Sequence, residues 1–401
     1  MAMLFGTVEN AVAVGKRHLT PVAPDSSNFI RASVMYFSPL DEFSSSMGHC
    51  ALHMECPSEG FDVIFSQSVV QDRFEWKQLL GRFSVRMESL VASDVLARSK
   101  REGRMVSEWQ LNLTHHEKQR LWMLLDKTVK ADRSDDYFCI VNSHCVAAVL
   151  HALEQCTIDE YIDIENVPEP LTLPQGDYMR WSERDYPWYS FMVATMGGDG
   201  YDRNDPAEHI VCPEVLFSTL QYATLRPSDN VSDTVAARPL LIGNPRQLLP
   251  LVNKQEPSVV TPWMVFMALL AVTVLVTLLE WLLRQKGMAR IFDRTLFSLY
   301  AVWSVVVLWL AVMGMSFTAA QWNWYLVPFN PIPVVVWLCY RRHPQYHKVF
   351  WLYAVVLALF LLATPLSAQI DAEHQFITAS LLIRCIRKII NTNNNKNKTR
   401  E

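Results

Sequence analysis

The sequence has little glycine and little charge. Only 13 of its 401 residues are glycine, which excludes a collagen-like chain and glycine-rich linker architectures. Charged residues make up 19% and hydrophobic residues 50%, whereas an average soluble protein has about 25% charged residues. Intrinsic disorder needs the opposite balance of low hydrophobicity and high charge. The chain is therefore expected to fold, and its length allows one or two soluble domains beside any membrane part.

The eight cysteines also lack a metal-binding pattern. No Cys-x-x-Cys is present, and no paired Cys/His spacing fits zinc. We therefore expect no metal site. We also expect no other cofactor and no nucleic-acid partner. A disulfide framework is not expected either, because a domain of this size can bury a core without one. One bridge among the first six cysteines stays open.

The last third of the sequence is rich in long apolar stretches. A transmembrane helix needs about 20 apolar residues, and five stretches approach or exceed that length, at residues 262–283, 295–317, 325–340, 349–370 and 376–390. The third is short and contains three prolines, and the fifth ends with three basic residues that we expect to snorkel to the interface. We predict about five transmembrane helices. A set of buried core helices is the alternative interpretation.

Charge is divided unevenly between the two parts. Residues 1–261 carry 23 Lys and Arg against 35 Asp and Glu, whereas residues 262–401 carry 13 against 5. With five crossings, all 13 basic residues lie on one side of the membrane, within 284–294, 341–348 and 384–401. Because basic loops stay in the cytoplasm, we predict a membrane protein with a cytoplasmic C-terminus and residues 1–261 outside the cytoplasm.

The first 29 residues conflict with that orientation. An exported domain should follow a signal peptide, and residues 1–29 contain Lys16 and Arg17 but no apolar run of about 7–15 residues. We base the predicted orientation on the loop charges, because 13 basic residues support it, whereas only the missing signal peptide argues against it. We describe residues 1–29 as an atypical N-terminus.

The soluble part mixes strand and helix patterns. Residues 50–55 and 61–65 read as two strands joined by a turn, and 104–113 as a third strand. Thr114 and Glu117 have the spacing of a capping box, which predicts a helix to about Lys130. Further expected elements are a strand at 137–141, a helix at 145–156, proline-rich linkers at 167–174 and 250–262, and a smaller α+β unit at 175–250.

Two short segments carry the residues for thiol chemistry. His49 follows Gly48 at the head of an apolar strand, and Cys145 opens a helix. A helix N-terminus favours the thiolate and offers backbone N–H groups to an oxyanion. Cys145 is thus the candidate nucleophile and His49 the candidate base. Most lone cysteines are buried small hydrophobes, so this spacing alone is a weak signal.

The other histidines and cysteines receive lower weight. We give His53 and His144 less weight than His49, and we expect His115 and His116 to be solvated in a first helical turn. The remaining cysteines of the soluble part are expected to be dispensable for chemistry, namely Cys50, Cys56, Cys139, Cys156 and Cys212.

Several segments follow one another in a characteristic order. The soluble part contains FSSSMGHCALHM, FDVIFSQS, VSEWQLNLTHHEKQRLWMLL and DDYFCIVNSHCVAAVLHAL. Later segments are PWYSFMVATMGGDGYDR, AEHIVCPEVLFSTLQYATL, QWNWYLVPFNPIPV and LSAQIDAEHQFITASLLIR. In order and spacing these segments resemble the Lnb-type lipoprotein N-acyltransferase family of Bacteroidetes bacteria, from about residue 30 to about residue 390. The resemblance implies a location in the cell inner membrane, with the soluble part in the periplasm.

The resemblance implies a fold and a domain plan. The fold is an α+β thiol domain of the permuted papain-like, NlpC-type kind, in which His precedes Cys, followed by an α-helical membrane domain. Gly48-His49 and Cys145 match the family's motif positions, and Ser66 and Gln67 are candidates for orienting His49. The expected boundaries are 30–165 for the catalytic domain, 166–261 for an accessory periplasmic region and linker, 262–391 for the transmembrane domain and 392–401 for a cytoplasmic tail.

The resemblance also implies an acyltransferase activity. The enzyme would move an acyl chain from a phospholipid of the bilayer to the α-amino group of a lipoprotein's lipidated N-terminal cysteine, through a thioester on Cys145. Two rival functions stay open: a membrane-anchored cysteine peptidase or amidase acting on the cell wall, and an inert membrane scaffold.

Overall fold

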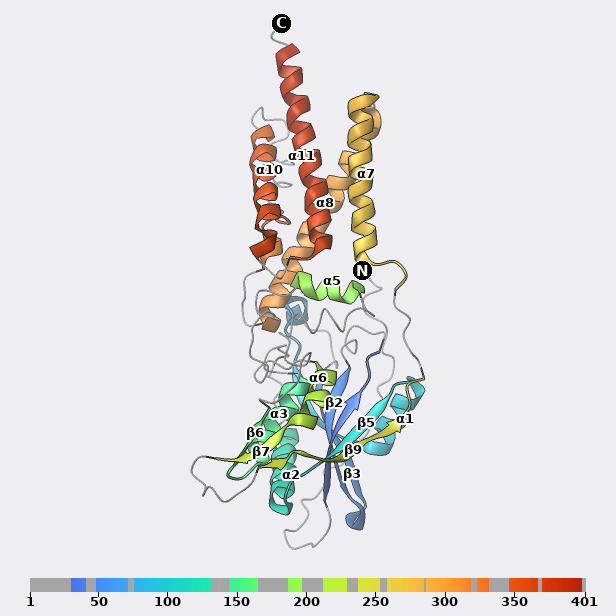
Figure 1. Ribbon diagram of the computed structural model, residues 1–401, viewed down its shortest axis with the longest axis vertical. Coiled ribbons are helices and arrows are strands. Elements are labelled where there is room, and N and C mark those ends of the chain that lie inside the picture. The colour runs from blue at the N-terminus through green and yellow to red at the C-terminus, as the bar shows by residue number, and fades with distance from the viewer. Residues whose placement is uncertain are drawn as a thin grey trace.

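The computed structural model describes the chain in thirteen segments. These are residues 30–40, 48–70, 76–131, 137, 144–164, 187–196, 212–228, 237–252, 258–284, 286–318, 323–331, 346–366 and 370–398. Figure 1 shows them as a soluble α+β part below a set of long helices. The predicted strand at 137–141 and the linker at 167–174 lie largely or wholly outside these segments.

A six-stranded antiparallel sheet forms the centre of the soluble part. Its strand order is β4-β3-β2-β1-β5-β9. The strands are β1 (Arg31–Phe37), β2 (His49–Cys56), β3 (Phe61–Val69), β4 (Val85–Val91), β5 (Val106–Leu111) and β9 (Leu241–Leu249). The predicted strand pair is confirmed as β2 and β3, and the third predicted strand as β5.

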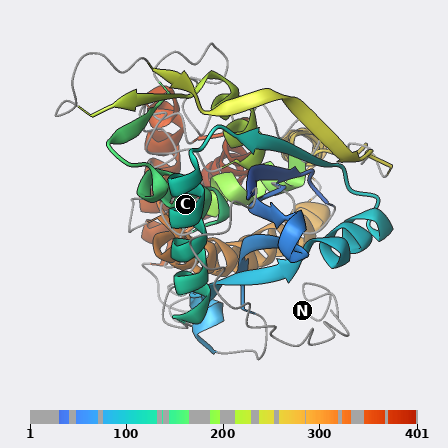
Figure 2. The same cartoon turned by 90° about the horizontal axis from the view of Figure 1, so that it is seen from below.

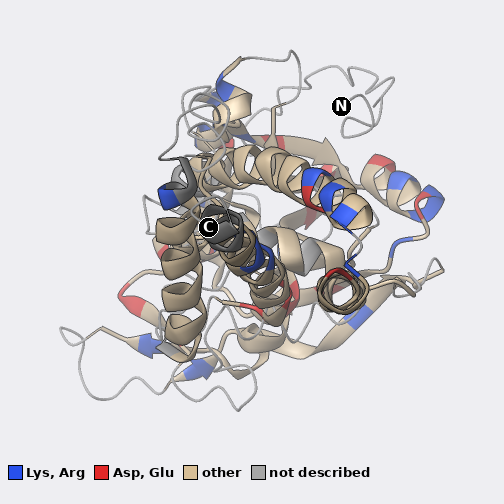
Figure 3. Cartoon of the chain, turned by 90° about the horizontal axis from the view of Figure 1, so that it is seen from above, with Lys and Arg blue, Asp and Glu red and all other residues tan. Residues whose placement is uncertain are grey.

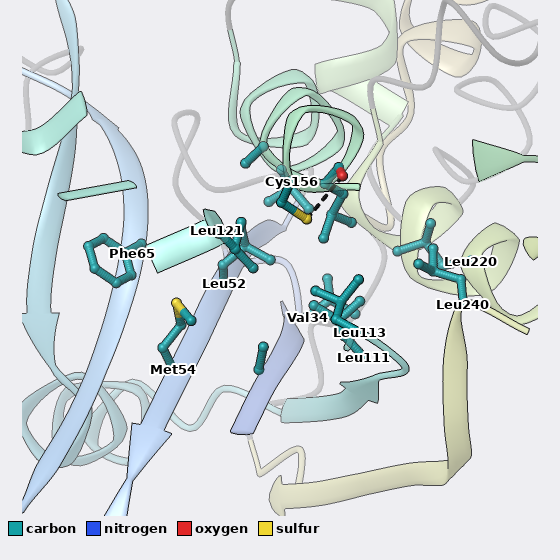
Figure 4. Packing of buried hydrophobic residues seen from close by; sticks show 14 of the residues in the cluster. Val34, Leu52, Met54, Phe65, Leu111, Leu113, Leu121, Cys156, Leu220 and Leu240 are labelled. Atoms are coloured by element: carbon teal, nitrogen blue, oxygen red, sulfur yellow. Dashed lines mark hydrogen bonds between the residues drawn. The ribbon is translucent and has the colours of Figure 1, made fainter. Parts of the chain in front are cut away.

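Helices cover both faces of this sheet. Alternate side chains of a strand point to opposite faces, so Leu52 of β2 packs with α2 (His115–Lys130) and α3 (Cys145–Cys156), while Ala51 packs on the face of α1 (Ala92–Arg101). Figure 2 shows α1 on one side of the strands and α2 on the other. Figure 4 shows the larger core, where Leu52 and Phe65 of the sheet meet Leu121 of α2.

Local signals begin and end these elements as expected. The Thr114 hydroxyl accepts from the Glu117 N–H, and the Glu117 carboxylate accepts from the Thr114 N–H, which completes the predicted capping box of α2. Between β2 and β3, the turn η2 (Pro57–Glu59) ends at Gly60, whose φ of 63° favours glycine.

The described part of the region after α3, where we expected a smaller α+β unit packed on the preceding domain or near the membrane, contributes strands to two sheets. Its strand β9 pairs with β5 as the sixth strand of the main sheet, where it covers backbone groups that an edge strand would expose. A second sheet contains β6 (Glu160–Asp163), β7 (Thr224–Pro227) and β8 (Arg238–Pro239). The helix α6 (Pro213–Thr219) and the turn η6 (Leu220–Tyr222) pack on the main sheet. Arg238 of β8 ties this second sheet to α2, because it binds Glu117 of α2 at 2.8 Å and Glu160 of β6 at 2.6 Å.

The C-terminal part is helical. It contains α7 (Pro262–Leu282), α8 (Lys286–Thr318), η7 (Trp324–Leu326), α10 (Tyr346–Ala363), η8 (Thr364–Leu366) and α11 (Ala372–Lys398). In the described residues, α7 and the segment Lys286–Met313 of α8 are long and apolar enough to cross a membrane. The third predicted stretch lies mostly outside those residues, so the count of five crossings stays a prediction.

The basic residues of α11 do not all behave as predicted. Arg384 is 1% exposed and does not snorkel. Its guanidinium instead donates to Asp293 of α8 at 2.6 Å and to Glu280 of α7 at 2.9 Å. Buried charges need such partners, and this cluster joins three helices. Figure 3 shows the bundle from above, with its Lys and Arg residues in blue.

One short helix lies between the soluble part and the bundle. α5 (Pro187–Met196) crosses beneath the long helices in Figure 1. Its Phe191 ring stacks on His374 of α11 at 4.6 Å and on Trp303 of α8 at 5.6 Å. Thr195 is hydrogen-bonded to His374 Nε2 at 3.0 Å. These contacts fix α5 against the bundle.

Candidate catalytic site

His49 is positioned by the tight entry into β2. The preceding Gly48 has a φ of 82°, and a Cβ there would meet the Phe37 carbonyl oxygen at 2.8 Å. Only glycine fits that position without strain. The chain therefore reaches β2 close to the end of β1, and the His49 ring packs 5.9 Å from the Phe37 ring.

Ser66 of β3 orients the His49 ring. His49 Nε2 lies 2.7 Å from Ser66 Oγ, and Ser66 is buried. This contact leaves Nδ1 as the ring nitrogen available to a reacting group. Of the two candidates from the sequence, the structure therefore brings Ser66 to the imidazole. Gln67 does not fill that role, and its buried Oε1 has no hydrogen-bond partner.

Cys145 is the first residue of α3. The preceding His144 is extended, with a φ of −145°, and its carbonyl accepts the first helical hydrogen bond, from Ala148 N–H at 2.9 Å. The N–H groups of the first turn consequently have no acceptor within the helix. N–H groups at a helix start next to a nucleophile can receive an oxyanion.

The surroundings of Cys145 favour its thiolate. A hydrogen bond from the neighbouring Cys50 thiol has the largest effect and lowers the pKa of Cys145 well below its ordinary value, against the opposing effect of burial. The charge of a protonated His49 lowers it further. Burial, together with the hydrogen bond to Cys145, raises the pKa of Cys50.

His144 lies beside the same thiol. Its ring lowers the pKa of Cys145, yet neither ring nitrogen meets the geometry of a hydrogen bond, and the side chain is only 4% exposed. A buried imidazole without a partner is uncommon. We gave His144 less weight than His49 from the sequence, whereas the structure places it beside Cys145.

Cys50 is the site residue that sequence reasoning missed. We expected it to be dispensable, but it contacts the nucleophile candidate directly. The strand alternation contained the signal, because Cys50 shares the α3 face of β2 with Leu52 and Met54. What the sequence did not show was where α3 begins relative to that face.

The remaining candidates lie elsewhere. Burial would lower the pKa of His53, but hydrogen bonds to Glu108 at 3.0 Å and Asp62 at 2.7 Å outweigh it and raise the pKa. His53 is thus a partnered structural residue. His115 and His116 are exposed, as predicted.

The other described cysteines are unlike Cys145. Burial raises the pKa of both Cys156 and Cys212 to about 12, so these thiols are inert near neutral pH. All six described cysteines are free: Cys50, Cys56, Cys145, Cys156, Cys212 and Cys385.

The site lies at the end of the sheet that faces the bundle. β3 runs from Phe61 to Val69, and the chain then reaches η3 (Trp76–Leu80), which contacts α8. Ser66 is near that end of β3, and His49 begins the antiparallel neighbour β2. His49 and Ser66 therefore lie at the membrane-proximal end of the sheet.

Comparisons with known families agree with this arrangement. The family model of the Lnb N-terminal periplasmic domain matches residues 25–182, and that of the Lnb transmembrane domain matches residues 254–396. The chain belongs to the Lnb family. It is accordingly a membrane protein with a periplasmic N-terminal domain, and His49, Ser66 and Cys145 all lie within the matched periplasmic domain. Neither the curated proteins nor the solved structures contained a match.

Proposed function

We propose that this Lnb-family protein is a lipoprotein N-acyltransferase whose nucleophile is Cys145 and whose base is His49. The observation that carries the proposal is the thiol itself: it begins a helix, accepts a hydrogen bond from Cys50 and adjoins an imidazole held by Ser66. A polarised thiol, an oriented base and free N–H donors are the requirements of acyl transfer through a thioester.

In the first half-reaction, the Cys145 thiolate attacks an ester carbonyl of a membrane phospholipid. A C–S bond forms, and the first-turn N–H groups of α3 receive the oxyanion. The C–O bond then breaks, and the leaving alkoxide takes a proton from the His49 imidazolium. The products are the acyl-thioester and a lysophospholipid.

In the second half-reaction, the α-amino group of a lipoprotein attacks the thioester. Neutral His49 takes the proton from the attacking nitrogen, the C–N bond forms, and the thiolate of Cys145 leaves. Ser66 keeps the imidazole oriented throughout. The acceptor becomes an amide, and the enzyme returns to its starting state.

The location of the site favours an amine over water as the acceptor. Donor and acceptor are both anchored in the bilayer, and the membrane-proximal end of the sheet holds His49 and Ser66. Confinement at one surface raises their effective concentration. A cell-wall hydrolase with the same Cys145 remains the alternative that the experiment must separate.

The experiment is mass spectrometry of lipoprotein N-terminal peptides from cells that lack this protein and any redundant acyltransferase. We expect loss of the amide-linked acyl chain, restored by the wild-type protein but not by Cys145→Ala. Unchanged N-acylation together with altered cell-wall fragments would instead support the hydrolase.

We also propose the topology and domain plan. The periplasmic domain has a permuted papain-like arrangement, five helices cross the inner membrane, and the C-terminus is cytoplasmic. Reporter fusions at Gly287 and Gln321 are expected to report opposite sides. A reporter at Glu401 that is active only outside the cytoplasm would overturn this orientation.

A further inference from the structure

The connection between β3 and β4 carries an apolar patch that the acyl-transfer steps do not use. It lies on η3, where Trp76 is 65%, Leu79 41% and Leu80 36% exposed. Single exposed apolar side chains are ordinary, but three within one short helix form a contiguous patch. We call Trp76, Leu79 and Leu80 the tip.

The tip contacts a membrane-spanning helix. The indole Nε1 of Trp309 in α8 donates to the Leu79 carbonyl at 2.6 Å. Trp309 lies inside the apolar span Lys286–Met313 of α8, nine residues before the helix ends at Thr318, which corresponds to about 14 Å along a helix. α7 leads away from the periplasmic domain and α8 returns toward it, so this end of the span is on the domain's side (Figure 1).

The lipid-facing side of α8 continues into the tip. Near Trp309, Val305 is 59% and Leu308 41% exposed. Apolar side chains of a transmembrane helix that are exposed in the protein face the hydrocarbon of the bilayer. Since Leu79 is bonded to the helix at this level, the tip extends the same apolar surface sideways from α8.

Basic residues flank the tip. Lys77 lies within η3, and Arg82 follows it with an exposed side chain. An indole and leucines beside lysine and arginine are typical of a segment at the boundary between headgroups and acyl chains, where the cations meet phosphate groups. A patch built to bind another protein would not need to lie against a membrane span.

We propose that the tip inserts into the periplasmic leaflet and binds membrane phospholipid, with the apolar side chains among the acyl chains and Lys77 and Arg82 at the phosphates. Ser66 lies on β3, which leads directly into the connection that carries the tip. If the proposed acyl transfer is correct, insertion holds the open end of the Cys145 site at the height of a phospholipid ester.

The insertion can be tested without any enzyme activity. Full-length protein carrying photoreactive benzoylphenylalanine in place of Leu79 is placed in vesicles of phosphatidylethanolamine and phosphatidylglycerol, irradiated and examined by mass spectrometry. The matched control carries the same label at Met123, which is 60% exposed on α2, away from the bundle (Figure 1). We expect a phospholipid adduct at position 79 and none at 123. Absence of the adduct at 79, or equal adducts at both positions, would overturn the proposal.

A second experiment connects the tip with the reaction. The double substitution Leu79→Asp and Leu80→Asp is expected to slow acylation of Cys145 by bilayer phospholipid about tenfold or more, since burying one leucine favours the inserted state by that factor. Acylation by a water-soluble short-chain phospholipid should not change, nor should Met123→Asp alter either rate. Equal loss with both donors would contradict a role in membrane insertion.

The membrane insertion of the tip and the acyl transfer through Cys145 can be refuted independently of each other. The photo-adduct at position 79 is expected to form equally in a Cys145→Ala background, because it requires no thioester. A protein that gives the adduct but never acylates Cys145 would retain the membrane tip and lose the proposed function. A protein that acylates Cys145 but gives no adduct would show the reverse.

Discussion

Cys50 offers a direct test of how the site activates its nucleophile. Replacing Cys50 by alanine removes the S–H donor to the Cys145 thiolate, which is the largest influence lowering the pKa of that thiol. A hydrogen bond to a charged group contributes about 1.5–3 kcal/mol, and S–H is a weak donor, so the loss should lie near the lower limit. About 1.4 kcal/mol corresponds to a factor of ten in an equilibrium constant.

The sign of the effect follows from which form the donor stabilises. Cys50 stabilises the thiolate, so its removal raises the pKa of Cys145. Thiolate is present above the pKa, and reactivity falls as the pH falls through it. At a pH below both values, Cys50→Ala should therefore react about tenfold more slowly than wild type. At a pH above both values, the two proteins should react alike.

The assay is the rate of iodoacetamide alkylation of Cys145 against pH, followed on the peptide that contains it in the full-length protein. Cys50→Ser is the matched control, because its hydroxyl still donates to the thiolate, and it should stay within a few-fold of wild type. If Cys50→Ala and wild type give the same pH profile, the reasoning about the paired thiols is wrong.

Four further substitutions test other parts of the structure. Cys145→Ala and His49→Ala should each abolish acyl transfer while the protein still accumulates in the membrane, since removing one member of a nucleophile–base unit costs nearly as much as removing both; wild-type activity in either variant contradicts the assignment. Ser66→Ala should lower kcat about tenfold with little change in KM, because it releases the imidazole without touching the substrate, and Ser66→Thr should restore much of it. Arg384→Met should destabilise the bundle by about 3–5 kcal/mol, because the buried Asp293 carboxylate would lose its hydrogen bond to Arg384 and Glu280 would keep only Asn391 and Arg387; thermal unfolding in detergent measures this, and an unchanged midpoint would refute it.

The local elements were predictable because short-range signals specify them. Thr114 and Glu117 lie three residues apart and form the capping box that begins α2. Gly60 with its positive φ closes the turn between two apolar strands. Likewise, α3 begins at Cys145, where the apolar pattern starts.

Pairings between distant segments were not predictable from the sequence alone. β9 contains Pro245, and most of its side chains are exposed, so it does not read as a strand. It forms because β5 offers an unpaired edge, and an edge strand tolerates proline. Arg384 was expected at the membrane interface, since the sequence does not show that Glu280 and Asp293 approach it.

The residues of the candidate site also fall into two groups, those that local sequence signals identified and those that only the packing of the fold revealed. A turn and a helix start identified His49 and Cys145 as single residues. The choice of Ser66 over Gln67, and the contact of Cys50 with Cys145, depend on how β2, β3 and α3 pack. Sequence therefore identified the chemical groups, and tertiary structure determined their partners.

The central claim is that Cys145 carries an acyl chain, and its most direct test is to trap that thioester. Full-length protein is incubated in vesicles of a phospholipid with a defined acyl chain and no lipoprotein acceptor, then digested at acidic pH for mass spectrometry. We predict that the peptide containing Cys145 gains the mass of that acyl chain and loses it on treatment with hydroxylamine. An unmodified Cys145 peptide, or the acyl chain on another residue, would contradict the account.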